Sequence, residues 1–167
     1  MKFIFDDGGR KAAGYKGSTG DCVVRAVAIA TEQPYQMVYD ALAHGMQTQR
    51  STRRSKRAGS GRNGVSVTRK WFKDYMTARG WRWTPTMLIG SGCTVHLADG
   101  ELPMGRLVVS VSKHYTAVID GVVHDTHDPQ REGETLYGVV KTATGWLHNQ
   151  VIGKSGGRCV YGYWSKS

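Results

Sequence analysis

The stretch HYTAVIDGVVHDTH, residues 114–127, decides the fold that we expect for this chain. Two runs rich in β-branched and aromatic residues flank Asp120-Gly121, and such residues favour strands. Asp-Gly between two runs of this kind is a strong signal for a two-residue hairpin turn. The stretch therefore predicts two antiparallel strands, His114–Ile119 and Val122–Asp125.

The short turn also predicts the register of the two strands, because Ile119 must then pair with Val122. Opposed residues and their second neighbours share one face of a sheet. One face is therefore expected to carry four polar side chains: His114, Thr116, Asp125 and His127. Asp125 is diagonal to His114, with Cβ atoms roughly 5–8 Å apart, a separation that a carboxylate and an imidazole can close.

The other polar residues near the hairpin are less well placed to meet His114. Asp120 in the turn is roughly 20 Å away along the strand. Asp128 and His124 are expected on the opposite face, and only a one-residue bulge would turn them toward His114. Residues 124–128 can also be interpreted as a polar strand end or a metal site, but strand alternation divides the potential ligands between two faces. We expect no metal and no cofactor.

Outside the hairpin, the pattern predicts helices first and strands afterwards. Apolar residues at helical spacing indicate a buried helix that starts at about Asp21, a good N-cap, a second that starts at Pro34, and a third from about Val67 to Gly80. Further strands are expected at Trp81–Thr84, Arg106–Ser112, Tyr137–Val140 and Cys159–Trp164. This order is typical of an α+β domain, and we expect one domain over residues 1–167, with helices packed on an antiparallel sheet.

The composition excludes several classes of protein. The chain is 40% hydrophobic and 22% charged, as an ordinary globular domain is. It has no run of about 18 apolar residues that could cross a membrane. The first seven residues, MKFIFDD, lack the apolar core of a secretion signal. We therefore expect a cytoplasmic protein.

The formal net charge of +10 comes from one segment. Residues 41–73 hold nine basic residues and no acidic one. The densest part, residues 47–64, is rich in Ser, Gly and Arg and predicts a flexible insertion. It could bind nucleic acid or an acidic protein, or it could simply be a solvated loop. The candidate binding residues are Arg50, Arg53, Arg54, Lys56, Arg57 and Arg62.

The three cysteines are too few for a disulfide scaffold and form no CxxC pair. We expect free thiols. Cys22 would lie in the first turn of a buried helix, where unpaired amides and the helix dipole lower a thiol pKa. Cys93 with His96 is a second candidate pair, and Cys159 has the pattern of a core residue in a strand. The alternative interpretation is that Cys22 is an unreactive small residue at the start of a helix.

The residues around Cys22 and His114 resemble the papain-like cysteine peptidase superfamily. Residues 19–26, TGDCVVRA, are similar to the Asp-Gly-Asn-Cys-Leu-Phe-Arg-Ala signature of ovarian-tumour-type deubiquitinases, and residues 114–118, HYTAV, are similar to their His-Tyr-x-x-Val strand. Phage-encoded proteins of this type share the arrangement. The two motifs and the chain order cover about 30 residues.

The resemblance implies a papain-like fold in which Cys22 is the nucleophile, His114 the general base and Asp125 the group that orients His114. It also implies that the amide of Cys22 is one oxyanion donor. The chain departs from the pattern in two places, because Thr19 replaces an aspartate and Lys16 replaces the papain-type glutamine. The second oxyanion donor would then be Thr19, Ser18 or a backbone amide.

The sequence thus predicts a cysteine-dependent acyl hydrolase, of the peptidase or isopeptidase kind, that acts on a peptide or protein substrate. The alternative is a non-catalytic module of the same fold whose basic segment binds nucleic acid or an acidic protein.

Overall fold

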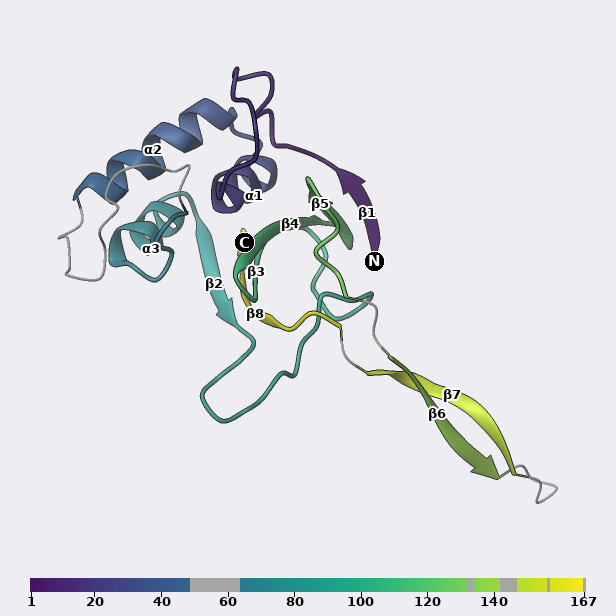
Figure 1. Ribbon diagram of the computed structural model, residues 1–167. Coiled ribbons are helices and arrows are strands. Elements are labelled where there is room, and N and C mark those ends of the chain that lie inside the picture. The colour runs from purple at the N-terminus through teal and green to yellow at the C-terminus, as the bar shows by residue number, and fades with distance from the viewer. Residues whose placement is uncertain (49–63, 132–133, 142–146, 156, 167) are drawn as a thin grey trace.

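The computed structural model describes residues 1–48, 64–131, 134–141, 147–155 and 157–166. These residues form three helices and eight strands (Figure 1), so the fold is a mixed α+β fold, as the sequence predicted. The helices are α1 (Cys22–Thr31), α2 (Tyr35–Thr48) and α3 (Lys70–Thr77). The predicted insertion at 47–64 lies almost entirely outside the described residues, and α2 extends over its first two positions.

Six strands form the main sheet in the order β1-β5-β4-β3-β8-β2. Their bounds are β1 (Lys2–Phe5), β2 (Trp81–Pro85), β3 (Arg106–Val111), β4 (His114–Ile119), β5 (Val122–Asp125) and β8 (Val160–Lys166). The expectation of a purely antiparallel sheet is wrong, because β1 pairs in parallel with β5. Strand β1 lies in a segment for which the sequence analysis predicted no helix or strand, and it becomes a strand by hydrogen bonding to a partner far away in the sequence.

The hairpin that the sequence analysis started from is confirmed. Its strands are β4 and β5, and Val118 pairs with Val123 and Ile119 with Val122. Both turn residues have positive φ, 47° at Asp120 and 77° at Gly121. This conformation matches the handed twist of paired strands, and glycine adopts it without strain.

The other predicted elements are found with shifted ends. The third helix begins only at Lys70, and the predicted strand from Cys159 begins at Val160. The predicted strand Tyr137–Val140 lies inside β6 (Glu134–Lys141). Its partner β7 (Leu147–Ser155) was not predicted, and the two form a separate ribbon that extends away from the main sheet in Figure 1.

Helix α1 is buried over most of its circumference, between the sheet and α2. Every residue from Val23 to Ala30 is buried, and α1 packs chiefly on β4. The aromatic residues Phe72, Trp81 and Trp164 complete this core. A second apolar cluster, with Leu107, Val118 and Val123 among its members, forms the remaining core of the sheet. Since α1 is fixed by packing on β4, its first residue is held near the start of that strand.

Across the helices that the structure describes, none is both long enough and apolar enough to cross a membrane.

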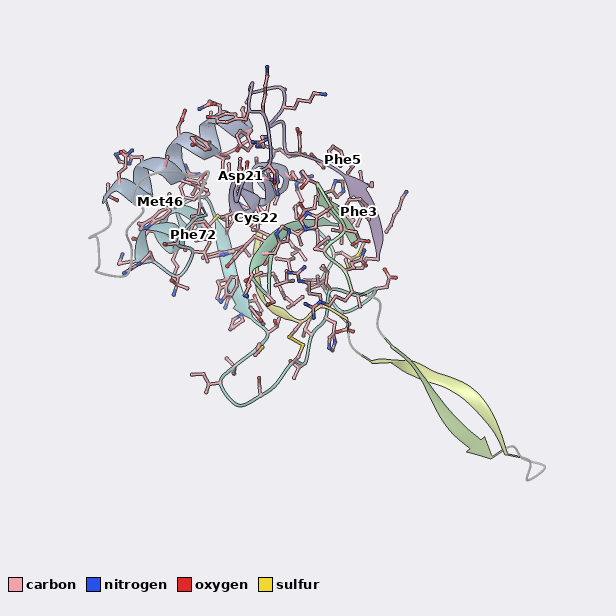
Figure 2. The ribbon with its side chains drawn as sticks, viewed as in Figure 1. Phe3, Phe5, Asp21, Cys22, Met46 and Phe72 are labelled. Atoms are coloured by element: carbon pink, nitrogen blue, oxygen red, sulfur yellow. A yellow bond between two sulfur atoms is a disulfide. The ribbon has the colours of Figure 1, made fainter. Side chains whose placement is uncertain are left out.

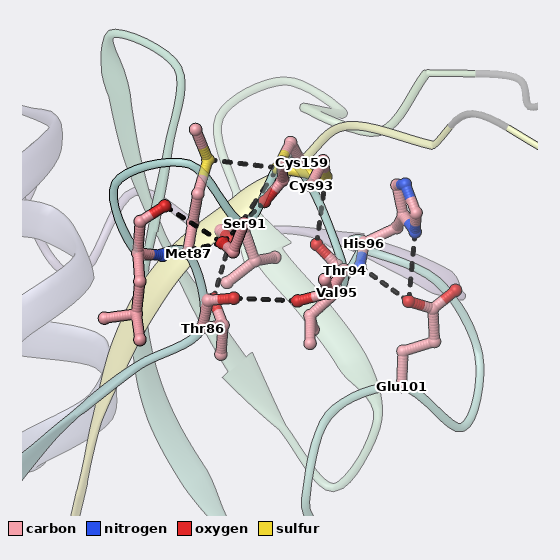
Figure 3. Close-up of a disulfide and its surroundings, with 12 residues drawn as sticks. Thr86, Met87, Ser91, Cys93, Thr94, Val95, His96, Glu101 and Cys159 are labelled. Carbon is pink, nitrogen blue, oxygen red and sulfur yellow. Dashed lines mark hydrogen bonds and ion pairs between the residues drawn. A yellow bond between two sulfur atoms is a disulfide. The ribbon is translucent and has the colours of Figure 1, made fainter.

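The expectation that all three cysteines are free is wrong. Cys93 and Cys159 form a disulfide (Figure 3), with Cα atoms 5.8 Å apart, and Cys22 is the free cysteine. Cys159 is therefore not a simple core residue. The bond joins the loop after β2 to the residue before β8, where His96 and Cys159 also form a β-bridge. The sequence did not predict this pairing because the two cysteines are 66 residues apart and only the fold brings them together.

We expect the unfolded, unreduced protein to show one reactive thiol and the reduced protein to show three, as counted with a chromogenic disulfide reagent. We also expect Cys93→Ser to lower the free energy of unfolding in urea by about 2–4 kcal/mol, because the bond restricts the unfolded chain. Three reactive thiols before reduction would contradict the disulfide.

Candidate functional site

A buried polar contact joins β4 to β5. His114 opens β4 and Asp125 ends β5, so the antiparallel pairing places the two residues side by side. His114 Nε2 donates to Asp125 Oδ2 at 2.7 Å. The other carboxylate oxygen, Oδ1, accepts the backbone N–H of Thr126 at 2.7 Å. Asp125 is only 3% exposed, so both bonds are shielded from water.

Cys22, the first residue of α1, supplies the third group. Figure 2 shows it beside Asp21, where α1 begins. The His114 side chain and the backbone of Tyr115 lie beside the thiol, and hydrogen bonding with them lowers its pKa. Because His114 Nε2 is bonded to Asp125, Nδ1 is the ring nitrogen left for the thiol. The structure thus brings together Cys22, His114 and Asp125, the series of thiol, imidazole and carboxylate that the sequence analysis selected, and the bond that it defines within this series is the one between His114 and Asp125.

The electrostatics of this series favour an ionised thiol beside a protonated imidazole. Burial alone would raise the pKa of Cys22, but the hydrogen bond with His114, the Tyr115 backbone, and the charges of His114 and Arg25 outweigh it and lower the pKa. Burial alone would lower the pKa of His114, but Asp125 and Cys22 raise it to about 9. The pKa of Asp125 is lowered, because the bond with His114 outweighs its burial.

A buried charge cluster lies behind the series. Asp21 precedes α1 as predicted, but its carboxylate does not cap the helix. It is 1% exposed and accepts bonds from Arg10 Nε at 2.8 Å, from the Tyr35 hydroxyl at 2.5 Å and from Arg25. A buried carboxylate needs such partners because it has lost its hydration. Burial, followed by the bond to Asp21, raises the pKa of Tyr35, so its hydroxyl stays a donor.

Arg25 connects this cluster to the candidate site. One arm of its guanidinium is paired with Asp21, and the Nη2 atom lies 3.8 Å from Asp125 Oδ1. Helix α1, which carries Cys22, is thereby tied to the strand end that carries Asp125. The sequence analysis assigned Arg25 no role. The available signal was a single charged residue inside the apolar run from Val23 to Ala30, since a charge there requires a buried partner.

Two groups in or just before the first turn of α1 are the candidate oxyanion donors. The amide of Cys22 belongs to the first turn of α1, whose N–H groups have no partner within the helix. The Thr19 hydroxyl is buried and makes no hydrogen bond with any residue that the structure describes. A buried hydroxyl without a partner is costly, so its free donor is a feature to explain. Ser18 and Lys16, by contrast, are exposed.

The alternative assignments from the sequence are not formed. Cys93 is held in the disulfide, and the ring of His96 faces Glu101, with 3.1 Å between Nδ1 and Oε2. His124 points away from His114, as expected, and its Nδ1 lies 3.4 Å from Asp6 Oδ2. Asp128 accepts bonds from Gln130 instead of approaching His114. The six basic residues proposed for partner binding, Arg50 to Arg62, lie outside the described residues.

His127 adds a second imidazole beside His114, as the register predicted. The two ring centroids are 4.8 Å apart. Potential ligand atoms of His114, Asp125 and His127 all lie within 4.8 Å of one another, so a metal ion is conceivable there on geometry. The Arg25 guanidinium beside Asp125 adds positive charge to this set, which opposes a cation. We therefore assign no ion to it.

In comparisons with known proteins, no family model, no curated protein and no solved structure matched this chain. The site is therefore interpreted from its own geometry.

We expect Arg25→Gln to lower the free energy of unfolding by about 3–5 kcal/mol, because it leaves two buried carboxylates without their shared cation. Urea unfolding followed by circular dichroism measures this. The matched control is Lys70→Gln, which breaks an exposed pair with Asp74 and should cost less than about 1 kcal/mol. Equal losses in both variants would contradict a structural role for Arg25.

The lowered pKa of Cys22 predicts how its alkylation depends on pH. With iodoacetamide, the rate should reach half its maximum at a lower pH in the folded protein than for the same thiol in the urea-unfolded chain. Asp125→Asn should move this midpoint upward, because the neutral amide no longer stabilises the imidazolium that stabilises the thiolate. Thr126→Ala is the neighbouring control, since its bond to Asp125 comes mainly from the backbone. An unchanged midpoint in Asp125→Asn would contradict the coupling.

Proposed function

We propose that this protein is a cysteine-dependent acyl hydrolase of the peptidase or isopeptidase kind, with Cys22 as nucleophile. The observation that carries the proposal is the buried bond between His114 and Asp125, with the Cys22 thiol beside the His114 ring. A nucleophile, a base and a group that holds the base are the three parts that thiol catalysis needs. All three side chains are at least half buried, and their pKa shifts favour the reactive ionic form.

In the first half of the reaction, the Cys22 thiolate attacks the carbonyl carbon of the substrate. The carbonyl π electrons move to oxygen and form a tetrahedral oxyanion. When the oxyanion collapses, the bond to the leaving group breaks, and the His114 imidazolium gives its proton to the departing amine. Asp125 keeps the ring oriented and stabilises its positive charge before the proton leaves.

In the second half, water hydrolyses the thioester at Cys22. Neutral His114 takes a proton from the water as it attacks the acyl carbon, and the acid product leaves with the restored thiolate beside an imidazolium. The raised pKa of His114, about 9, belongs to the resting ion pair. Loss of the thiolate charge on acylation removes one cause of that rise, so the ring becomes easier to deprotonate when it must act as a base.

The oxyanion would be stabilised by the amide of Cys22 and by the Thr19 hydroxyl. An unsatisfied buried donor near a nucleophile is suited to this task, because its hydrogen bond is made only when charge develops on the substrate oxygen. This role for Thr19 would explain why its hydroxyl lacks a partner among the described residues. The Asp125 carboxylate does not compete with the substrate oxygen for the Thr19 hydroxyl, since it is already bonded to His114 and Thr126.

The resemblance to papain-like and ovarian-tumour-type peptidases is part of this proposal. What supports it is the chain order, with a cysteine at a helix start and a histidine opening a later strand. A cytoplasmic location is likewise a proposal from the sequence. The Cys93–Cys159 disulfide counts against it, because disulfides persist mainly in oxidising compartments.

The second candidate is a binding module without turnover. It is favoured by the surplus of basic residues between positions 41 and 73, which would bind nucleic acid or an acidic protein. Such binding weakens steeply with salt, because bound counterions are released. If Arg53, Arg54 and Arg57 are responsible for the binding, neutralising all three should weaken binding to a nucleic acid and reduce the slope of its salt dependence.

The proposed activity is tested with an activated acyl ester and with an electrophilic acyl probe. Wild-type protein should release the alcohol in a burst and become labelled at residue 22. Cys22→Ala should abolish both, and His114→Ala should slow acylation by about 10²–10⁴-fold. His124→Ala is the matched control, since that ring lies on the other face and should leave the rate unchanged. Full activity in Cys22→Ala would sink the proposal.

A further inference from the structure

A cavity of about 620 Å³ borders the candidate site on the side of His127. Its wall is built from the N-terminal segment, from Phe5 to Thr19, and from Arg25, Thr126 and His127. His127 is the link to the chemistry, because its ring centroid lies 4.8 Å from that of His114. Thr19, the buried hydroxyl proposed for the oxyanion, lines the same cavity. Cys22 and His114 do not themselves line the cavity, so a group held here would lie beside His127 and Thr19, next to the proposed reacting centre.

The charges on the wall are unbalanced. Arg10 and Arg25 each form an ion pair with buried Asp21. The acidic side chain on the wall, Asp7, accepts backbone N–H groups from Gly9 and Lys11 at 3.0 and 2.9 Å. Lys11 and Lys16 are exposed, and within the described part of the chain neither ammonium forms an ion pair.

The position of Lys16 is held by the charge cluster beneath it. Arg10 donates to the carbonyl of Lys16 at 3.1 Å and to that of Tyr15 at 3.5 Å, while its Nε is bonded to Asp21. The backbone that carries one of the two unpaired lysines is thus fixed against the same carboxylate that anchors α1. This preorganisation lowers the cost of binding an anion there.

We infer that this cavity binds a carboxylate of the substrate, next to the bond that Cys22 attacks. That the carboxylate belongs to a substrate rests on the proposed function. The anion site itself rests only on the cavity and the charges that line it. Phe5, 69% exposed on the rim, offers an apolar surface for the carbon chain that carries the carboxylate. The two sources of such a group in a peptide are a free C-terminus and an acidic side chain.

The test compares alkylation of Cys22 by iodoacetate, which is an anion, and by iodoacetamide, which is neutral. In both reactions the thiolate displaces iodide, so the thiolate fraction cancels in the ratio of the two rates. Lys11→Gln with Lys16→Gln should lower the iodoacetate-to-iodoacetamide ratio by about threefold at low ionic strength, and less in high salt. Lys11→Glu with Lys16→Glu should lower it further.

The matched control is Lys2→Gln with Lys166→Gln, which removes two charges from exposed positions that do not line the cavity and should leave the ratio unchanged. Protection against iodoacetamide distinguishes the carboxylate sources: N-acetylglycine imitates a C-terminus and N-acetylaspartate α-amide imitates an acidic side chain. We expect one of them to slow labelling in wild-type protein and not in the double glutamine variant.

An equal ratio in wild type, the double glutamine variant and the control, or no protection by either compound, would overturn the carboxylate site. Failure of the hydrolase proposal would give a different result. The protein would then not turn over the ester, but its preference for iodoacetate would still depend on Lys11 and Lys16.

Discussion

Arg25 is the residue on which the arrangement of the site depends. It is 8% exposed inside a helix that is otherwise apolar, and it lies between Asp21 and Asp125, two carboxylates that are themselves buried. Three buried charges are tolerated only when each is close to an opposite charge or a hydrogen-bond partner. That requirement restricts how α1 can pack against β5. Because Cys22 is the first residue of α1, its position relative to β5 is fixed by the same contacts.

The same cluster shapes the electrostatics around the thiol. The charge of Arg25 helps to lower the pKa of Cys22. The bond with His114 lowers the pKa of Asp125, Asp125 in turn raises the pKa of His114, and protonated His114 favours the thiolate of Cys22. Each step works against burial, which by itself would neutralise all three groups. Burial also strengthens the interactions, since water does not screen them. The Cys22 thiol is therefore made more reactive by a chain of neighbouring charges, each of which stabilises the next.

The N-terminal segment has two structural roles that its sequence did not reveal. Through β1 it extends the sheet in parallel with β5, and through Arg10 it reaches Asp21. These contacts bring Lys16 and Thr19 to a cavity beside His127. A segment in which the sequence analysis predicted no helix or strand thus forms the wall on one side of the candidate site. Its glycines gave no local signal of this, because the pairing partner is more than 100 residues away.

The features that could be predicted from the sequence are those whose causes are local. The Asp120-Gly121 turn set the register of β4 and β5, and with it the meeting of His114 and Asp125, because a two-residue turn leaves one pairing that keeps the apolar residues on a shared face. Apolar spacing likewise determined the three helices. Only the tertiary structure decided the contact of Cys22 with His114, the bridge from Arg25 to Asp125, the parallel strand β1 and the Cys93–Cys159 bond. Each joins segments whose encounter depends on how whole elements pack, and neither spacing nor residue type encodes that packing over such separations.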